Sequence, residues 1–598
     1  MQLNISDKIT FLIAGLLLVT MFTTAFFSMK QAALTYDELA HIPAGYSYLT
    51  QQDYRINPEH PPLAKSIGAF PLIFLDLNFP TDSPNWTQEN NPPAWWVQFD
   101  LGREFLYESG NNPRQIIVWS RFAMIGMLVF MGWFLFRWAR ELGGNKVALG
   151  VLALFSFSPT FLAHGRLVNT DIAAALGVVV ATYYWIKFIK NPSWINVVKA
   201  GVAFLFALLL KFSLILLVPF FGILAITYPL LSPGDKKKKL LEYIGKGALA
   251  GIIGVLLIWP VYQFAIANYP AERQLRDTVA DLQPESITVP ESAAVWMADK
   301  EPFRPWGQYA RGLLMAVQRG QFGNTTFFLG EMRSSSWFYY FPVMYATKIP
   351  IAFHLLTGMV ALWEIRRIIR ASRKSEKIKR GATWIKDNFD ISAFFLFIAI
   401  YWAASINTNL NLGIRHLMPI FPFMYFLVVL GAKRMFNGSY FTRNRTIAYS
   451  LVVVIFGWYG LSSLSVFPHY IPYYNALAGG TDDGYQVAVD SNYDWGQDFY
   501  KLVSYVEENN IEKVHLNYFG GEDPEYWLGD KYIKYNPRED ERPTGWLAVS
   551  VNELMGGKGE PHPTYDQPTG YYNWLNEYEP VEILGYSIFV YYIPPEIQ

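Results

Sequence analysis

Long apolar stretches recur along this chain, and they constrain its fold more than any other feature. A helix of about 18 or more apolar residues is long enough to cross the ~30 Å hydrocarbon core of a bilayer. Backbone polar groups in that core must bond within the protein, so only helices or closed barrels can cross it. The stretches lack the strict alternation of barrel strands, and only 16% of the residues are charged. The sequence therefore predicts a polytopic helical membrane protein.

Eleven apolar segments predict about eleven membrane-spanning helices. The fifth and sixth spans are separated only by Lys211, so a single long span is the alternative there, and it would invert the orientation of every later segment. The first span lacks a small-x-small cleavage site, which predicts a retained helix rather than a removed signal peptide. The predicted spans cover residues 9–28, 115–136, 147–163, 171–189, 195–210, 212–231, 247–267, 341–363, 390–407, 416–432 and 446–466.

Basic residues are distributed unevenly between the loops that join these spans. If the N-terminus is cytoplasmic, 24 of the 49 Lys and Arg residues fall in cytoplasmic loops, whereas the short outer loops hold only Arg166, Lys211 and Arg415. Cytoplasmic loops of membrane proteins carry an excess of Lys and Arg. The asymmetry predicts a multi-pass protein of the cell membrane with a cytoplasmic N-terminus. The basic loops are 137–146, 187–199, 232–246, 364–389 and 433–445.

The remaining long segments are predicted to lie outside the membrane. Residues 1–466 form the predicted membrane domain, with outer loops at 29–114 and 268–340, and residues 467–598 form a small soluble domain. Within that last region "KVHLNYF", "GWLAVSV" and "YSIFVYYIP" are typical of strands, and "GQDFYKLVSYVEENN" is typical of an amphipathic helix. The pattern predicts an α/β fold. Its 22 acidic and 7 basic residues give a net charge of −15, which is most simply a solvated surface.

Two features of the outer loops bear on function. "PPLAKSIGAFPLIFLDL", from residue 61, has an apolar face but is too short to span, so it predicts a helix lying in the membrane interface. The two prolines can begin that helix, because Pro fits the first helical turn. The second outer loop contains "PFRPWGQYARG" and many aromatic residues, and it is predicted to act as a gating lid.

Under the predicted topology, ionisable residues gather on the outer face of the membrane domain. Charged groups near a bilayer are costly and are candidates for function by default. A random scatter of such groups would divide between the two faces. The clustered residues are Asp37, Glu38, Glu59, His60, Arg166, Asp171, Lys211 and Arg415, the last followed by His416.

Carboxylates and cations at a membrane surface suit a substrate that has an anionic reactive group and a lipid tail. Cations stabilise a departing phosphate, and a carboxylate can accept a proton from an attacking hydroxyl. An inverting displacement at a sugar carbon needs one such base rather than the closely spaced pair of a retaining glycosidase. A sugar linked to polyprenyl phosphate meets these requirements.

Each of these residues also has a structural alternative. Asp37 and Glu38 could stabilise a helix N-terminus, and Asp171 is a suitable N-cap. Glu59 and His60 could simply precede a helix that begins at the proline pair. The remaining cations could reach the lipid headgroups as interfacial anchors, and these are Arg166, Lys211 and Arg415.

At these residues the sequence resembles the C-type glycosyltransferase superfamily. The nearest groups are protein O-mannosyltransferases and bacterial family 39 enzymes, which include aminoarabinose transferases that modify lipid A. The resemblance extends from the first span to about residue 500. It is carried by "DE" at 37–38, "NPEHPPLAK", "HGRLVNTD", "GIRHLMP" and "SNYDWGQD" at 491–498.

The resemblance implies an outer catalytic cavity and a polyprenyl-phosphate sugar donor. It implies that Asp37 is the catalytic base, that Glu59 helps to bind a metal or the acceptor, and that His60 faces the donor phosphate. His60 stands where the aminoarabinose type has a lysine, and it is similar to the mannosyl type instead.

The sequence therefore predicts an integral membrane glycosyltransferase that transfers a hexose or pentose, with inversion, to a glycan, lipid or protein hydroxyl. Asp37 and Glu38 are the predicted catalytic pair, with Asp37 as the base and Glu38 as the residue that orients the base or the acceptor. Asp171 is assigned with Glu59 to the acceptor or a metal. A divalent cation could assist phosphate departure, although the sequence does not require one. The predicted phosphate ligands are His60, Arg166, Lys211 and Arg415.

Other interpretations remain open at this stage. One alternative is a transporter or flippase of lipid-linked sugars, and another is a non-catalytic envelope assembly protein. The bilayer is an expected partner, and nucleic acid is not. The C-terminal domain is predicted to recognise the acceptor, through Asp490, Asp494, Trp495 and Asp498.

Overall fold

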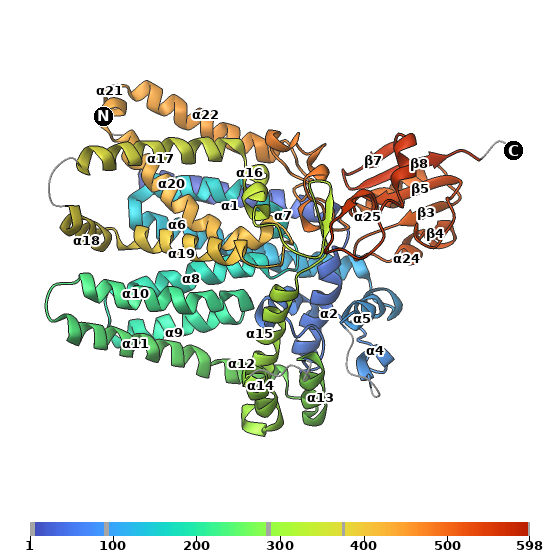
Figure 1. The fold of residues 1–598 in the computed structure, drawn as a ribbon, viewed down its shortest axis with the longest axis horizontal. Coiled ribbons are helices and arrows are strands. Elements are labelled where there is room, and N and C mark those ends of the chain that lie inside the picture. Colours follow the sequence, from blue (N-terminus) through green and yellow to red (C-terminus); the bar gives the residue numbers. More distant parts are fainter. Residues whose placement is uncertain (1–5, 89–94, 283–288, 373–376, 596–598) are drawn as a thin grey trace.

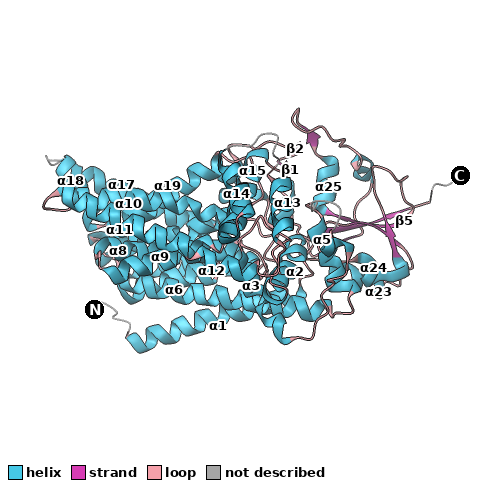
Figure 2. Cartoon of the chain, turned by 90° about the horizontal axis from the view of Figure 1, so that it is seen from below, coloured by secondary structure: helices cyan, strands magenta, loops and turns pink. Residues whose placement is uncertain are grey.

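The computed structural model describes residues 6–88, 95–282, 289–372 and 377–595. Within these residues the chain forms a body of long helices, a group of shorter outer helices at one end of that body, and a β-sheet domain beyond them (Figure 1). Figure 2 shows the outer helices between the helical body and the sheet. The expected division into a helical membrane region and a small C-terminal α/β region is confirmed.

Each predicted span lies mainly on helical residues, whereas the count of eleven spans stays a prediction. Among the described residues, eight helices are long and apolar enough to cross a membrane, or nine if the bent pair α16–α17 is one span. The protein is therefore a multi-pass membrane protein. The helices of the body are α1 (Asp7–Gln31), α6 (Pro113–Ser156), α7 (Pro159–His164), α8 (Asp171–Lys190), α9 (Trp194–Leu208), α10 (Leu217–Leu231), α11 (Lys236–Leu256), α12 (Ile258–Ala265), α16 (Tyr340–Lys348), α17 (Ile351–Ser372), α19 (Phe389–Ile406), α20 (Phe421–Phe436) and α22 (Arg445–Leu464).

Two boundaries show how single residues divide the apolar sequence. The second and third predicted spans meet in α6, where Gly144 has a φ of 73° that an L side chain rarely adopts. The fifth and sixth spans are separate helices, as predicted. Helix α9 ends at Leu208, Lys211 is extended, and the 3₁₀ helix η3 (Phe212–Leu216) then leads into α10. The alternative of one long span is therefore wrong.

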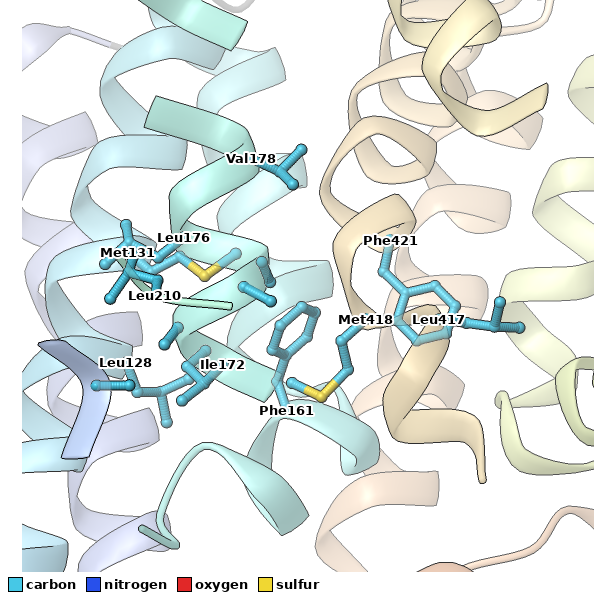
Figure 3. Close-up of a cluster of buried hydrophobic side chains, with 14 of the residues drawn as sticks. Leu128, Met131, Phe161, Ile172, Leu176, Val178, Leu210, Leu417, Met418 and Phe421 are labelled. Atoms are coloured by element: carbon cyan, nitrogen blue, oxygen red, sulfur yellow. The ribbon is translucent and has the colours of Figure 1, made fainter. Parts of the chain in front are cut away.

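A buried apolar core joins the ends of the helices that carry predicted site residues. Leu128 of α6, Phe161 of α7, Ile172 of α8 and Met418 pack together in Figure 3, and each is fully buried. Met418 belongs to η6 (Ile414–Ile420), the 3₁₀ helix that precedes α20. Within a membrane such contacts hold helices together through close van der Waals packing. The core therefore fixes the first turns of α8 and η6 relative to each other.

The first outer segment covers one end of the body. It contains α2 (Tyr36–Thr50), α3 (Pro62–Ala69), η1 (Phe70–Phe74), α4 (Pro84–Thr87) and α5 (Val97–Arg103), which runs into the π-helix η2 (Glu104–Glu108). Helix α3 begins at Pro62, as predicted, and η1 leaves Phe70 and Phe74 52% and 74% exposed. These exposed rings form an apolar surface of the kind that lies in a bilayer interface.

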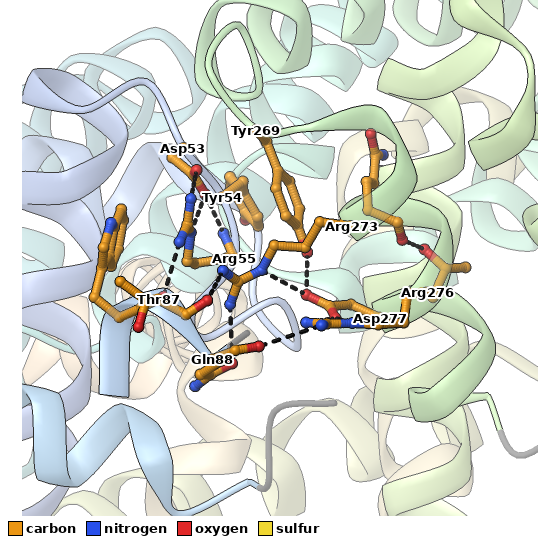
Figure 4. A network of polar contacts seen from close by, with 12 residues as sticks. Asp53, Tyr54, Arg55, Thr87, Gln88, Tyr269, Arg273, Arg276 and Asp277 are labelled. Atoms are coloured by element: carbon orange, nitrogen blue, oxygen red, sulfur yellow. Dashed lines mark hydrogen bonds and ion pairs between the residues drawn. The ribbon is translucent and has the colours of Figure 1, made fainter. Parts of the chain in front are cut away.

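The second outer segment is fastened to the first by a polar network (Figure 4). Arg273 donates to the carbonyl of Thr87 and to Gln88, and Tyr269 donates to Asp277 at 2.7 Å. The segment contains α13 (Ala271–Asp281), α14 (Val289–Asp299), η5 (Glu301–Phe303) and α15 (Arg304–Phe322), followed by β1 (Thr326–Phe328) and β2 (Glu331–Arg333). The network therefore holds α13 against the first outer segment.

The C-terminal region forms a mixed five-stranded sheet in the order β4-β3-β5-β8-β7. Strand β3 is parallel to β4 and β5, whereas β8 is antiparallel to β5 and β7. The three predicted strands and the amphipathic helix are confirmed as β3, β5, β8 and α23. The elements are α23 (Phe499–Glu508), β3 (Val514–Asn517), α24 (Pro524–Leu528), β4 (Tyr532–Lys534), β5 (Gly545–Ser550), α25 (Val551–Lys558), β6 (Glu560–Pro561), β7 (Glu582–Leu584) and β8 (Ile588–Ile593).

The two ends of the helical body differ in charge. The connection from α10 to α11, together with α18 (Lys377–Asp387) and α21 (Ser439–Arg443), lies at the end away from the C-terminal sheet (Figure 1). These elements belong to the basic loops of the sequence. The outer helices and the sheet lie at the opposite end, so the fold separates the basic loops from the predicted outer segments. The domain boundary at residue 466 stays a prediction.

Candidate active site

A cavity of about 480 Å³ lies at the end of the helical body that faces the C-terminal sheet. The first outer segment, η3, α15, α19, η6 and the C-terminal region all contribute to its wall. Of the predicted site residues, five line the cavity, and these are Asp37, Glu59, His60, Lys211 and Arg415. Three do not, and these are Glu38, Arg166 and Asp171.

A chain of alternating charges forms one side of the cavity. Nη1 of Arg415 lies 2.8 Å from Oδ2 of Asp37 and 3.5 Å from Oδ2 of Asp171. Nζ of Lys211 lies 2.5 Å from Oδ1 of Asp171. Asp171 is fully buried behind the cavity, whereas the Asp37 side chain is 26% exposed. Asp171 therefore holds both cations in place, and Asp37 presents a carboxylate to the open space.

Local sequence explains where these groups stand. Asp37 and Glu38 are in the first turn of α2, where the Glu38 carboxylate accepts hydrogen bonds from the N–H and hydroxyl of Thr35. This capping box fixes the start of the helix. Asp171 is the first residue of α8, and its N–H donates to Asn169. The two acids therefore enter the site from helix starts, where negative charge is favoured.

Glu38 lies on the far side of α2 from the cavity, in a fully buried ion pair. Its two carboxylate oxygens accept hydrogen bonds from Nε and Nη2 of Arg121 at 2.9 and 2.6 Å, and one also accepts from the N–H of Val168. Burial opposes the charge on Glu38, but Arg121 outweighs it and lowers the pKa of Glu38. Glu38 therefore does not face the cavity, and of its two predicted roles, orienting the base or the acceptor, this geometry fits the first.

Arg166 also departs from its predicted position. It is buried, and its Nη1 donates to the carbonyl of Ser28 at 3.1 Å. The loop that carries it runs behind the first turn of α2, where Val168 contacts both Glu38 and His41. Arg166 therefore cannot reach a ligand in the cavity from this position, and its place as a phosphate ligand is corrected.

The turn "INPEHPPLAK" is held by a lysine that the sequence argument did not assign. Nζ of Lys65 donates to Tyr48, to the carbonyls of Asn57 and His60, and to the Asn57 side chain, over 2.7 to 3.0 Å. Lys65 is almost fully buried. It therefore fixes the backbone on both sides of Glu59, which leaves Glu59 and His60 projecting at the cavity wall.

Glu59 is paired with a second residue that sequence reasoning missed. Nη1 of Arg319, on α15, lies 2.8 Å from Oε2 of Glu59, and Nε1 of Trp95 donates to Oε1. Arg319 lines the cavity, and its side chain is 33% exposed. The predicted lid thus supplies a cation to the site. Arg319 follows the quoted stretch "PFRPWGQYARG" in the same segment. No local sequence pattern identifies it as a site residue, because its position depends on how the whole segment folds over the cavity.

The histidines of the cavity are uncharged at neutral pH. The rings of His41 and His60 meet edge to face at 5.3 Å, and Nδ1 of His41 bonds the carbonyl of Val168. Burial lowers the pKa of His60 well below its ordinary value, and nearby cations lower it further. Burial also lowers the pKa of His41, although Asp37 opposes this. His60 therefore offers a neutral ring nitrogen rather than a cation.

The C-terminal region supplies part of the wall. Asp490, Trp495 and Phe519 line the cavity, and the ring of Trp495 lies 4.3 Å from the guanidinium of Arg415. Asp494 and Asp498 point away, into the C-terminal region. Asp494 accepts from the N–H groups of Asn552 and Gly496, and Asp498 accepts from Ser587 and Lys501. Of the four residues predicted to recognise an acceptor, only Asp490 and Trp495 are in position to do so.

The two cavity aspartates differ in their affinity for protons. Burial opposes the charge on Asp37, but Arg415 outweighs it and lowers the pKa of Asp37 below its ordinary value. Burial raises the pKa of Asp490 to about 6, with Arg415 opposing and Asp37 adding to the rise. Asp37 is therefore ionised throughout the physiological range, whereas Asp490 changes its charge within that range.

The carboxylates do not fit a divalent cation. Asp37 and Asp171 pair with Arg415, Asp171 also pairs with Lys211, and Glu59 pairs with Arg319. Within the part of the chain that the structure describes, no three His, Cys, Asp or Glu side chains are grouped so as to hold a metal ion. No step below uses a metal.

Comparisons with known proteins agree with this architecture. A family profile described as dolichyl-phosphate-mannose-protein mannosyltransferase matches residues 110–263. The structure of the S. cerevisiae protein O-mannosyltransferase Pmt1–Pmt2 complex bound to the sugar donor is similar, with a TM-score of 0.55 at 10% identity. The superposed region covers 78% of this chain and 90% of the mannosyltransferase chain. The chain therefore shares the overall fold of that mannosyltransferase structure.

Two further solved structures are similar at lower scores. ArnT from Cupriavidus metallidurans, bound to undecaprenyl phosphate, has a TM-score of 0.43 at 10% identity over 96% of this chain and 97% of that chain. The oligosaccharyltransferase AglB from Archaeoglobus fulgidus was solved in complex with an inhibitory peptide and a dolichol-phosphate. It has a TM-score of 0.43 at 12% identity, over 91% of this chain and 71% of that chain. A search of curated protein sequences finds no match.

Proposed function

We propose that the protein is an integral membrane glycosyltransferase that transfers a sugar from a polyprenyl-phosphate carrier to an acceptor hydroxyl, with inversion. The observation that carries the proposal is the convergence of Asp37, Lys211, Arg415 and Asp490, far apart in sequence, on one cavity at the end of the helical body. The fold shared with the mannosyltransferase structure and the matching family profile support it.

The donor phosphate would bind at the cations of the cavity. Arg415 has its Nε without a hydrogen bond among the described residues, and Trp495 supports its guanidinium from the side. Lys211 is close by, because the Asp171 carboxylate forms ion pairs with both Lys211 and Arg415. A phosphate between Arg415 and Lys211 would compete with Asp37 and Asp171 for these donors. Charge-assisted hydrogen bonds of this kind are stronger than neutral ones. The polyprenyl chain would extend from there into the bilayer.

Asp37 would act as the general base. The acceptor oxygen attacks the anomeric carbon, the bond from that carbon to the phosphate oxygen breaks, and the polyprenyl phosphate leaves with the electron pair. The proton of the acceptor hydroxyl passes to the carboxylate of Asp37. When Arg415 turns to the phosphate, Asp37 loses its counter-ion and becomes a stronger base at the moment when it is needed.

The other predicted residues take supporting roles. Glu38, with Arg121, fixes the first turn of α2 and so orients Asp37, and Asp171 spaces the two cations. Glu59 and Arg319 close the outer rim beside Trp95. Asp490 remains as a group that can accept a hydrogen bond from the acceptor. His60 contributes a neutral hydrogen-bonding ring rather than a charge.

The reaction would take place on the extracytoplasmic side of the cell membrane. The basic loops lie at the end of the body away from the cavity, and such loops are retained in the cytoplasm. The N-terminus would then be cytoplasmic, and the C-terminal sheet would lie outside. This orientation agrees with an acceptor that belongs to the cell envelope.

Neither rival function explains the cavity as well. A transporter is expected to bind its cargo near the membrane midplane, on broken helices in repeated halves. Here the charged groups lie at helix ends, next to the outer helices and the sheet. A scaffold does not need a carboxylate that is about a quarter exposed beside an arginine with an unused donor.

Mass spectrometry of envelope lipids, glycans and proteins would test the proposal. Cells lacking the protein are compared with cells that carry the wild type or Asp37→Asn. We expect one class of molecule to lose the mass of a single sugar in the deletion and in Asp37→Asn, and to regain it with the wild type. An Asp37→Asn protein that restores the full product would refute the catalytic assignment.

A further inference from the structure

The nine-residue segment 490–498, "DSNYDWGQD", belongs to the C-terminal region but contacts the backbone that leads into Arg415 and the backbone that leads into Asp37. One part of it grips the backbone just before Arg415. Oγ of Ser491 donates to the carbonyl of Leu412 at 2.6 Å, and Oδ1 of Asn492 accepts from the N–H of Ile414 at 3.0 Å. Gly413, between them, has a φ of 135°, and a Cβ there would lie 2.8 Å from Oδ1 of Asn492. This close fit fixes the approach to Arg415.

The other part of segment 490–498 grips the backbone just before Asp37. The N–H of Ala33 donates to the carbonyl of Gln497 at 2.9 Å, and the N–H of Tyr36 donates to the carbonyl of Trp495 at 3.2 Å. The indole ring of the same Trp495 lies against the guanidinium of Arg415. A cation over the face of a tryptophan ring is attracted by the negative charge of that face, and more strongly when the pair is shielded from water. Both members of the Asp37–Arg415 pair therefore rest on one short segment.

Segment 490–498 is itself firmly anchored on both sides. Nζ of the buried Lys348 donates to the carbonyl of Asn492 at 2.6 Å, and Nδ2 of Asn492 donates to the hydroxyl of Tyr340. On the other side, the Asp494 carboxylate and the N–H of Asp490 both bond Asn552, next to the start of α25. The segment is thus a rigid link from the helical body to the sheet.

We propose that segment 490–498 is the positioning element of the active site, with Asn492 and Trp495 as positioning residues that hold Arg415 at the cavity wall, where it can bind the donor phosphate. The proposal rests on the function proposed above and adds that the C-terminal region takes part in donor binding. Neither residue needs to touch the reacting atoms. Asn492 acts through the backbone at Ile414, and Trp495 acts through the face of the guanidinium.

Two variants test the two contacts separately. Asn492→Ala removes the acceptor for Ile414, and Trp495→Leu removes the aromatic face but keeps an apolar side chain. The purified full-length protein in nanodiscs is titrated with undecaprenyl phosphate, and product formation is measured by mass spectrometry in cells. We expect the Kd for undecaprenyl phosphate to rise about tenfold in each variant, and product to fall in parallel. Trp495→Phe should restore most of the affinity, because its ring can still lie against Arg415.

The matched control is Asn475→Ala. Asn475 is also buried, and its Nδ2 also donates two hydrogen bonds, to the carbonyls of Ala346 and Ile349 at 2.7 Å each. These bonds hold the backbone on either side of Lys348 and do not involve residues 412–415 or 33–36. We expect this variant to lose as much thermal stability as Asn492→Ala while keeping the wild-type Kd. A general loss of packing would affect both variants alike.

The outcomes separate this proposal from the proposed function. If Asn492→Ala and Trp495→Leu match Asn475→Ala in Kd and in product, the positioning role is overturned, whatever Asp37→Asn does. If Asp37→Asn keeps full product, the proposed function is refuted, and the positioning proposal that rests on it is refuted with it. Loss of product in Asp37→Asn together with weakened carrier binding in Asn492→Ala and Trp495→Leu supports both.

Discussion

Asp37 and Glu38 are neighbours in the first turn of α2, and each forms an ion pair with an arginine, yet the two pairs differ in every respect that matters for chemistry. The Glu38–Arg121 pair is fully buried, and Glu38 accepts hydrogen bonds from three residues. The Asp37–Arg415 pair faces the cavity, and Arg415 keeps an unused donor. A pair whose bonds are complete can only hold structure. A pair that faces a cavity and keeps an unused hydrogen-bond donor can exchange one partner for a ligand.

Substitution of Asp37 should separate activity from stability most sharply. Asp37→Asn keeps the size of the side chain and removes the base, so transfer should fall by about 10²–10⁴-fold. The thermal melting temperature should change little, because the side chain is partly exposed and Asp171 still neutralises Arg415. Transfer is measured by product mass spectrometry and melting by intrinsic fluorescence in detergent. A large loss of stability would mean that the cavity pair is structural after all.

Substitution of Glu38 should show the opposite pattern. Glu38→Gln leaves the Arg121 guanidinium buried without its counter-charge, and breaking a buried pair costs on the order of 3 kcal/mol. We expect a lower melting temperature and a lower yield of folded protein, while the transfer rate per folded molecule stays within a few-fold of wild type. Size-exclusion chromatography gives the folded fraction for that correction. A well-folded Glu38→Gln protein without activity would restore Glu38 to the catalytic pair.

Lys211 tests how the cavity pair depends on its neighbours. In Lys211→Met the Asp171 carboxylate loses its shortest contact and draws Arg415 away from Asp37. We expect roughly a tenfold loss of transfer, which corresponds to about 1.4 kcal/mol, and mainly through weaker donor binding. Lys246→Met is the control, since Lys246 also pairs with one acid, Glu242, but on α11 and away from the cavity. Equal losses in the two variants would argue against a local effect at Asp171.

The sequence predicted the helical body and the clustering of charge, because both follow from hydrophobicity and from the cost of charge near a bilayer. It could not separate Asp37 from Glu38. Consecutive residues of a helix point about 100° apart, so one faces the cavity and the other the core, and only the packing of α2 decides which. Arg166 was misplaced for the same reason, since a loop can turn either face inward.

Three cations were missed for different reasons. Arg121 lies inside a predicted span, and a charge in an apolar helix is itself a signal that a buried partner exists. Lys65 stands within the quoted turn, but its four hydrogen bonds arise only when the turn closes. Arg319 comes from the segment over the cavity, whose folding no local pattern describes. The sequence therefore indicates the chemistry available, and tertiary packing decides which groups share a cavity.

The smallest expected effect tests whether a third carboxylate tunes the cavity pair. Burial raises the pKa of Asp490 to about 6, so this group is neutral at pH 5 and charged at pH 7. Burial lowers the pKa values of His41 and His60, and the Asp490→Asn variant separates the contribution of Asp490 from theirs. Once charged, Asp490 shares the cavity with the donor phosphate and should weaken its binding roughly three- to fivefold, since a like charge nearby costs on the order of 1 kcal/mol in a partly solvated site. The affinity for undecaprenyl-phosphate mannose, a diester of constant charge, should therefore fall as the pH rises from 5 to 7. Asp490→Asn should bind equally well at both values, and parallel curves for the two proteins would show that Arg415 and Lys211 alone set the affinity.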